Sequence, residues 1–106
     1  MEWTTYLRDK VAGPVLHSAG HMYPSVATAI ACLDWLEAQG YEVLGFDGLN
    51  SDGRYIRPDL SFIADLSGID GEPRDRVARS IHEARQILSE FDGRVQFVDM
   101  TVRRAT

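Results

Sequence analysis

The sequence contains two stretches in which apolar residues recur every three or four positions, the spacing of one face of an α-helix. In the first stretch, residues 25 to 39, these positions are Val26, Ala29, Ile30, Leu33 and Leu36. Pro24 suits the first turn of such a helix, and Gly40 suits its end. We therefore predict a helix over residues 25 to 39 whose apolar stripe faces the core.

The second stretch runs from about Pro73 to Glu90. Its narrower stripe consists of Val77, Ile81, Ala84, Leu88 and Phe91. Polar and charged residues fill the other side, and Gly93 follows the expected end. This pattern predicts a helix that lies on a sheet with one side in water.

The first helix differs from the second because its back is also apolar. At 100° per residue, Trp35 falls opposite the centre of the stripe, and Ala27 and Ala31 keep that side small. We expect the amino-terminal segment, Trp3 to Tyr23, to cover this back.

The remaining segments have strand-like patterns. Tyr41 to Leu49 is an apolar run, and the Asn-Ser-Asp-Gly of residues 50 to 53 is typical of a turn. A short strand at Arg54 to Arg57 would pair back on the first strand, and Pro58 predicts a break or an edge position.

Two further strands are expected, at Leu60 to Leu66 and at Arg94 to Arg103. In the former, only Ile63 is out of phase with an inward set of Leu60, Phe62, Ala64 and Leu66. The latter changes phase, which indicates a bulge or burial on both faces. If these strands are neighbours joined through the second helix, they would run parallel with a right-handed crossover.

Together these elements predict an α/β or α+β fold with a single layer of mixed β-sheet, three to five strands, packed with two main helices. The 106 residues and 44% apolar content fit one domain, residues 1–106, whose core needs no disulfide or structural metal ion for stability. Cys32 is the only cysteine and lies in an apolar run, so we expect a small buried hydrophobe in a reducing compartment.

The acidity of the chain is local. Residues 34 to 75 carry ten carboxylates and three arginines, a formal charge of −7, while the rest of the chain sums to +2. A patch of one sign steers partners of the opposite sign, so we expect a basic protein partner, with no nucleic acid and no anionic membrane surface. Solubilising carboxylates on strands and turns are the simpler alternative.

Catalytic and metal-binding motifs receive little support. His17 and His21 have a spacing that would suit two metal ligands on a helix, but Gly13, Pro14 and Gly20 argue against a helix there. A calcium loop of the EF-hand type starting at Asp47 would need oxygen ligands at its third and fifth positions and glycine at its sixth, where this chain has Leu49, Ser51 and Asp52. We expect no cofactor, no bound metal and no catalytic residue; a small enzyme or metal-binding domain using His17, His21 and an acidic cluster is the alternative.

Two motifs and their order resemble a known family. The apolar helix runs into Leu-Glu-Ala-Gln-Gly-Tyr-Glu-Val-Leu-Gly-Phe-Asp at residues 36–47, followed by a polar turn and Pro58. The helix Ser-Ile-His-Glu-Ala-Arg-Gln-Ile-Leu at residues 80–88 precedes a Phe-Val strand at residues 97–98. This arrangement is similar to small immunity proteins of bacterial polymorphic-toxin and contact-dependent-inhibition systems. The resemblance implies a cytoplasmic, non-enzymatic protein that neutralises a cognate toxin.

The expected binding surface combines carboxylates with aromatic anchors. The residues chosen are Asp47, Asp52, Asp59, Asp65, Tyr55 and Trp35. Aromatic side chains are favoured as anchors because they lose little entropy on burial. Phe46 also flanks the acidic turn, with core packing as its alternative. A homodimer is a further alternative. No segment reaches the ~18 apolar residues of a membrane helix, and the amino terminus lacks a secretory pattern, so we expect a cytoplasmic protein.

Overall fold

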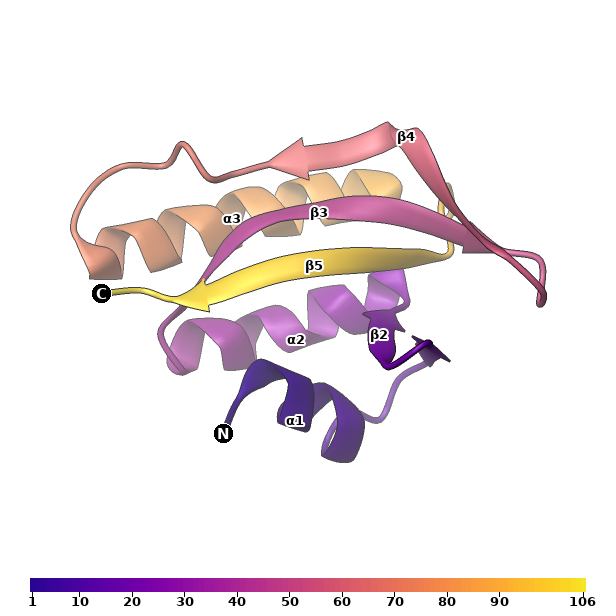
Figure 1. The fold of residues 1–106 in the computed structure, drawn as a ribbon. Coiled ribbons are helices and arrows are strands. Elements are labelled where there is room, and N and C mark those ends of the chain that lie inside the picture. The colour runs from indigo at the N-terminus through magenta and orange to yellow at the C-terminus, as the bar shows by residue number, and fades with distance from the viewer.

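The structure, a computed structural model, describes all of residues 1–106 and has the α+β architecture (Figure 1). A three-stranded sheet in the order β4–β3–β5 is covered on one face by two helices. Its elements are α2 (Val26–Ala38), β3 (Tyr41–Ser51), β4 (Ile56–Asp65), α3 (Pro73–Phe91) and β5 (Phe97–Arg104). The prediction of one sheet layer with two main helices is confirmed.

All strand pairs in the sheet are antiparallel, which corrects part of the prediction. β3 lies at the centre and pairs with both β4 and β5. The strands before and after α3 are therefore not neighbours, and the parallel pairing expected between them does not form. Antiparallel pairing is the result because β3 and β4 form a hairpin, and β5 adds to the other edge of β3.

The boundaries of the two main helices follow from local chemistry. The Ser25 hydroxyl caps α2 by accepting a hydrogen bond from the Thr28 amide at 3.1 Å. Pro24 is the last residue of a strand and not part of the first helical turn, which corrects that prediction. Pro73 occupies the first turn of α3 as expected, and Gly40 and Gly93 have positive φ just beyond α2 and α3.

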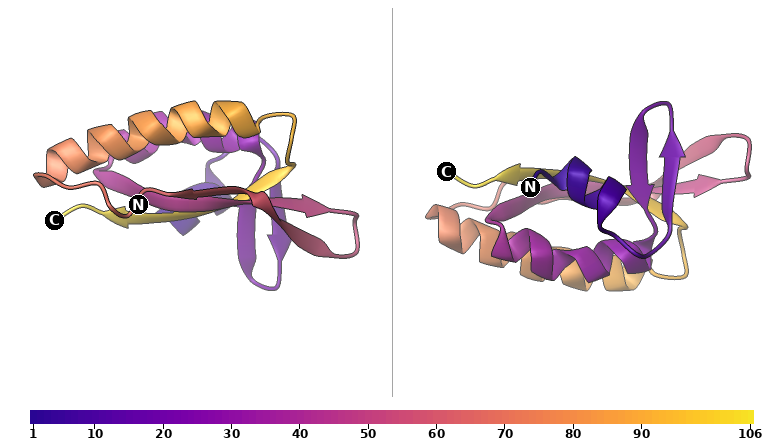
Figure 2. Two further views of the ribbon diagram at one scale, coloured as in Figure 1. Left: turned by 90° about the horizontal axis from the view of Figure 1, so that it is seen from above. Right: turned by 90° about the horizontal axis from the view of Figure 1, so that it is seen from below.

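The amino-terminal segment folds into a short helix, α1 (Trp3–Asp9), and a hairpin of β1 (Val15–Ser18) and β2 (His21–Pro24). α1 covers the back of α2, as predicted: the Trp35 ring stacks on Tyr6 with centroids 3.8 Å apart. The hairpin stands out from the sheet on the side away from α2 and α3, near the tip of the β3–β4 hairpin (Figure 2).

β4 is one continuous edge strand with an irregularity, where the sequence predicted two strands with a break or an edge position at Pro58; the edge position is the one observed. The register jumps from Asp47 opposite Ile63 to Gly48 opposite Asp59. A Cβ at Gly48 would lie 2.8 Å from the Cβ of Phe62, so the irregularity depends on a glycine there. Leu60 is 80% exposed because it belongs to the looped-out residues, not to the inward set as predicted.

The core lies between the sheet and the two helices. Phe46, Ala64 and Met100 project from the three strands toward α2 and α3, and Phe91 packs edge-on against Phe46. Cys32 is buried in this core, and burial raises the pKa of its thiol to about 11. None of the three helices combines the length and the apolar character needed to cross a bilayer.

Candidate protein-binding surface

The side of the sheet that faces away from α2 and α3 carries a set of exposed side chains, here called the open face. Side chains alternate along a strand, so the neighbours of the inward Phe46, Ala64 and Met100 point outward. These outward residues are Asp47, Ile63, Asp65, Asp99 and Thr101, and all five are exposed. Seen along its edge in Figure 2, the sheet has both main helices on one side only.

The strand register places three carboxylates together on the open face. Asp47 lies directly between Ile63 on β4 and Asp99 on β5. Asp65 lies opposite Gly45, which is two residues before Asp47 along β3. Thr101 lies on the other side of that glycine. Between Asp47 and Asp65 is a hollow of about 280 Å³, with Gly45 and Thr101 in its lining.

None of these three carboxylates forms a salt bridge, although six salt bridges occur elsewhere in the chain. Asp47 and Asp99 face each other as cross-strand neighbours, an arrangement of like charges that disfavours folding. The side chain and the amide of Ser67 both donate to Asp65, and these hydrogen bonds lower the pKa of that carboxyl. The three carboxylates of the open face are therefore exposed and without a cationic partner within the chain.

Two of the chosen residues, Asp52 and Tyr55, lie at the tip of the β3–β4 hairpin and not on the open face. β3 continues through Asn50 and Ser51, so the turn comes later than predicted. The amides of Tyr55 and Arg54 donate to Asp52, which lowers the pKa of its carboxyl. Tyr55 is 57% exposed, as a docking anchor requires.

The hairpin tip adjoins the β1–β2 hairpin. A hollow of about 350 Å³ separates them, with Leu16, His17 and Ser18 on one wall and Arg54, Tyr55 and Ile56 on the other. The Arg54 guanidinium lies over the Tyr55 ring at 5.6 Å from its centroid. This end of the sheet thus carries two exposed arginines, Arg54 and Arg57, beside an exposed aromatic ring.

The other chosen residues are placed elsewhere. Asp59 lies opposite Gly48 at the β4 irregularity, where it is half-buried and accepts a hydrogen bond from the Ser61 amide. Trp35 belongs to the aromatic cluster between α1 and α2, with the Tyr41 ring 5.8 Å away, and the structure does not bring it to the open face. Phe46 is a core residue, the alternative that the sequence left open.

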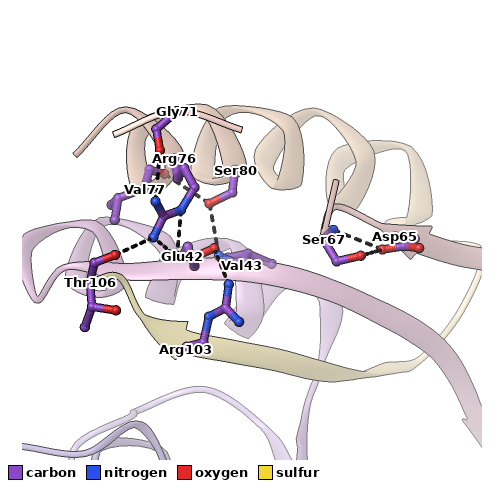
Figure 3. Close-up of polar contacts among 10 residues, drawn as sticks. All are labelled: Glu42, Val43, Asp65, Ser67, Gly71, Arg76, Val77, Ser80, Arg103 and Thr106. Carbon is purple, nitrogen blue, oxygen red and sulfur yellow. Dashed lines mark hydrogen bonds and ion pairs between the residues drawn. The ribbon is translucent and has the colours of Figure 1, made fainter. Parts of the chain in front are cut away.

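Three acids of the stretch 34 to 75 form ion pairs with arginines, and the first is Asp52 at the hairpin tip, 3.6 Å from Arg57. Glu42 is buried between Arg76 of α3 and Arg103 of β5, at 3.2 and 3.1 Å (Figure 3). Burial alone would raise the pKa of Glu42, but the hydrogen bonds and charges of the two arginines outweigh it and lower that pKa. On the surface, Asp34 pairs with Arg85 across α2 and α3.

The two histidines that suggested a metal site lie in the β1–β2 hairpin. His17 pairs with Met22, and His21 pairs with Ser18, so the two imidazoles project from opposite faces of the hairpin. His21 stacks near Tyr23 with ring centroids 6.2 Å apart. No three His, Cys, Asp or Glu side chains are grouped to hold a metal ion, and the alternative function gains no support from this geometry.

Three residues of the open face, Ile63, Asp99 and Thr101, were missed by sequence reasoning. Asp99 lies outside the acidic stretch, and Ile63, 52% exposed, was treated only as an interruption of a pattern. The available signal was the alternation in residues 97 to 101, where Asp99 and Thr101 are the polar positions. Pairing Ile63 and Asp99 with Asp47 required the antiparallel register, which local patterns do not supply.

Comparisons with family models, with curated protein sequences and with solved structures found no significant match to this chain.

Proposed function

We propose that this protein is an immunity protein that binds and neutralises a cognate bacterial toxin domain, with the open face as the centre of its binding surface. The observation that carries this proposal is the group formed by Asp47, Asp65 and Asp99. These three carboxylates are exposed, form no salt bridge and stand on one sheet held rigid by two helices. A basic protein surface is the electrostatic complement of such a group.

The repulsion between Asp47 and Asp99 supports a binding role. Folding alone gains nothing from two carboxylates in directly opposed positions on neighbouring strands. A positively charged partner would relieve that repulsion on docking, so the energy stored in the free protein would favour the complex. Toxin domains that act on nucleic acid or another anionic substrate present a suitable basic cleft.

Apolar contacts would complete the surface. Ile63 lies beside Asp47, and Tyr55 is exposed at the hairpin tip. An arginine or lysine of the toxin fits the hollow between Asp47 and Asp65, because its aliphatic stem packs on Ile63 while its charged end meets the carboxylates. The proposed role requires no catalytic group or cofactor, and the family resemblance implies a cytoplasmic protein.

Rescue of growth tests the proposal. The protein is produced in a bacterium together with the variable carboxy-terminal domain of a large secreted protein encoded beside its gene. We expect full growth with the wild type and loss of protection when Asp47→Lys and Asp99→Lys are combined. The matched control combines Glu37→Lys with Glu90→Lys, the same change of charge on exposed helix positions, and should protect fully.

Two results would count against the proposal. Toxicity that the wild-type protein does not reduce would remove the immunity role. Equal protection by the two double variants would show that neutralisation does not use the open face. Binding of the purified pair should also weaken steeply with added salt, first through the association rate.

A further inference from the structure

The edge of β4 offers free main-chain groups. The Leu66 amide donates to the Leu44 carbonyl at 2.8 Å, so these residues form a hydrogen-bonded pair of the β3–β4 ladder. Hydrogen-bonded and non-hydrogen-bonded pairs alternate in antiparallel strands, which makes Phe46 and Ala64 the next bonded pair. Ile63 and Asp65 therefore direct their N–H and C=O groups away from β3, toward the side where no strand lies.

A hollow of about 490 Å³ begins at the end of this same strand. One wall is the segment from Asp65 to Ile69, and the other is the exposed flank of α3, with Ala78, His82 and Glu83. Figure 1 shows this segment and α3 at the same border of the molecule, next to β4. The lining mixes apolar side chains with charges, and Arg79 in it is already bound to the Asp70 carbonyl at 2.8 Å.

From these two features we propose that β4 accepts an extended segment of the toxin as an added strand, running alongside Ile63 and Asp65 and over the hollow against α3. This inference rests on the proposed function, since it names how the partner docks. Free edge groups beside a helix-walled hollow are what strand addition uses: the main chain supplies affinity and alternate side chains supply specificity. The added strand would lie about 4.8 Å from β4.

The chemistry of the added segment follows from its two sides. On the open-face side its side chains would stand beside Ile63 and Asp65, next to Asp47, so basic residues fit there. On the other side they would meet Leu66, Ile69 and Ala78, so an apolar residue fits there. An alternating basic and apolar segment is therefore the expected ligand.

A second copy of this chain fits the edge less well than a basic partner. Each copy has a net charge of −5 and would bring its own Asp65 to the junction. Pro58 and the register jump near Leu60 also limit regular pairing to the last residues of β4. Charge complementarity thus selects a foreign, basic strand.

The test uses a probe peptide, acetyl-Arg-Val-Arg-Val-Arg-amide, and a matched peptide with glutamate in place of arginine. Backbone amide shifts of the labelled protein are recorded by NMR during titration. We expect saturable shifts at residues 63 to 69 and 78 to 83, slower exchange of the Ile63 and Asp65 amides, and binding of the glutamate peptide at least about tenfold weaker. Shifts centred on β5, α1 or α2 would overturn the proposal.

Substitution of Ile63 separates main-chain pairing from side-chain contact. Ile63→Pro removes a donor that points to the free edge and takes no bond from the β3 ladder, whereas Ile63→Val keeps the donor. We expect Ile63→Pro to bind the arginine peptide about tenfold more weakly and Ile63→Val to bind within about twofold of wild type. Equal binding by the two folded variants would overturn strand addition.

A modified peptide keeps the test valid if Ile63→Pro does not fold. Two peptides are N-methylated, one at both valines and one at the central arginine, so that each blocks a different alternate set of donors. One of them should lose binding to the wild-type protein and the other should keep it; equal binding by both would refute main-chain pairing. A peptide-free dimer that Ile63→Pro converts to a monomer would assign the edge to a second copy and also refute the proposal.

The two proposals fail in distinguishable ways. If the wild-type protein protects against the toxin but the arginine peptide does not bind at β4, the immunity role holds and strand addition is wrong. If the peptide binds at β4 but no protection is seen, strand binding holds and the immunity role is wrong.

Discussion

Glu42 and Asp47 lie on the same strand, yet their environments are opposite. Glu42, with 6% of its side chain exposed, is held between Arg76 and Arg103. Asp47 is exposed, has no cationic partner and faces another carboxylate, Asp99. The contrast teaches that a count of charges along a segment does not measure its surface potential. The tertiary partners decide which acids stabilise the fold and which remain available to a ligand.

Substitution of the buried acid should have the largest effect on stability. Glu42→Gln leaves Arg76, itself mostly buried, without its anionic partner, and we expect the free energy of unfolding to fall by about 3 kcal/mol. Chemical denaturation measures this change. Asp34→Asn is the matched control, because it breaks an exposed pair with Arg85 and should cost less than about 1 kcal/mol. Equal losses in the two variants would mean that Glu42 is not a structural ion-pair centre.

The aromatic residues allow the same comparison between packed and exposed positions. Trp35→Ala removes the ring that stacks on Tyr6 and should lower the free energy of unfolding by about 2 kcal/mol. Tyr55→Ala, at the exposed hairpin tip, should change it by less than about 0.5 kcal/mol. A stable Trp35→Ala variant that lost toxin binding instead would return Trp35 to the binding surface.

Acid should weaken the fold through Glu42. Its pKa in the folded protein lies below the ordinary value of 4.5, so unfolding at low pH is accompanied by proton uptake. The stabilisation from Glu42 is therefore complete above about pH 5 and is lost as the pH falls through the lowered folded-state pKa. Thermal unfolding from pH 6 to pH 2.5 should show a smaller acid loss for Glu42→Gln than for the wild type. Parallel curves for the two proteins would contradict this origin.

The exposed acid should have the smallest effect on stability. Asp47→Asn removes repulsion with Asp99, so we expect the free energy of unfolding to stay within about 0.5 kcal/mol of wild type or to rise. The same variant should slow association with a basic partner, as measured by surface plasmon resonance at low salt. Destabilisation by more than about 1 kcal/mol would show that Asp47 supports the fold.

Local patterns were sufficient for the elements whose signals are local. The stripes ending at Leu36 and Phe91 predicted both main helices, and the apolar back of α2 predicted its cover by the amino-terminal segment. The edge position of Pro58 also followed from one residue, because proline lacks the donor that an interior strand needs.

The features that could not be predicted from the sequence depend on pairing between residues far apart in the chain. Leu60 fits an alternating pattern, but because of the register jump opposite Gly48 its side chain is exposed to solvent. The acids of the open face could not be grouped beforehand, because Asp99 reaches Asp47 only through the pairing of β5 with β3. Trp35 was ambiguous for the same reason: an aromatic on the back of a helix becomes core or surface according to what covers it.

The single cysteine has a practical consequence for all of these measurements. Cys32 lies within the core with a thiol pKa of about 11, so it is shielded from maleimide reagents under conditions that preserve the fold. A Thr101→Cys substitution on the exposed side of β5 would then carry the sole reactive thiolate, and a fluorophore attached there would report docking without background from a second label.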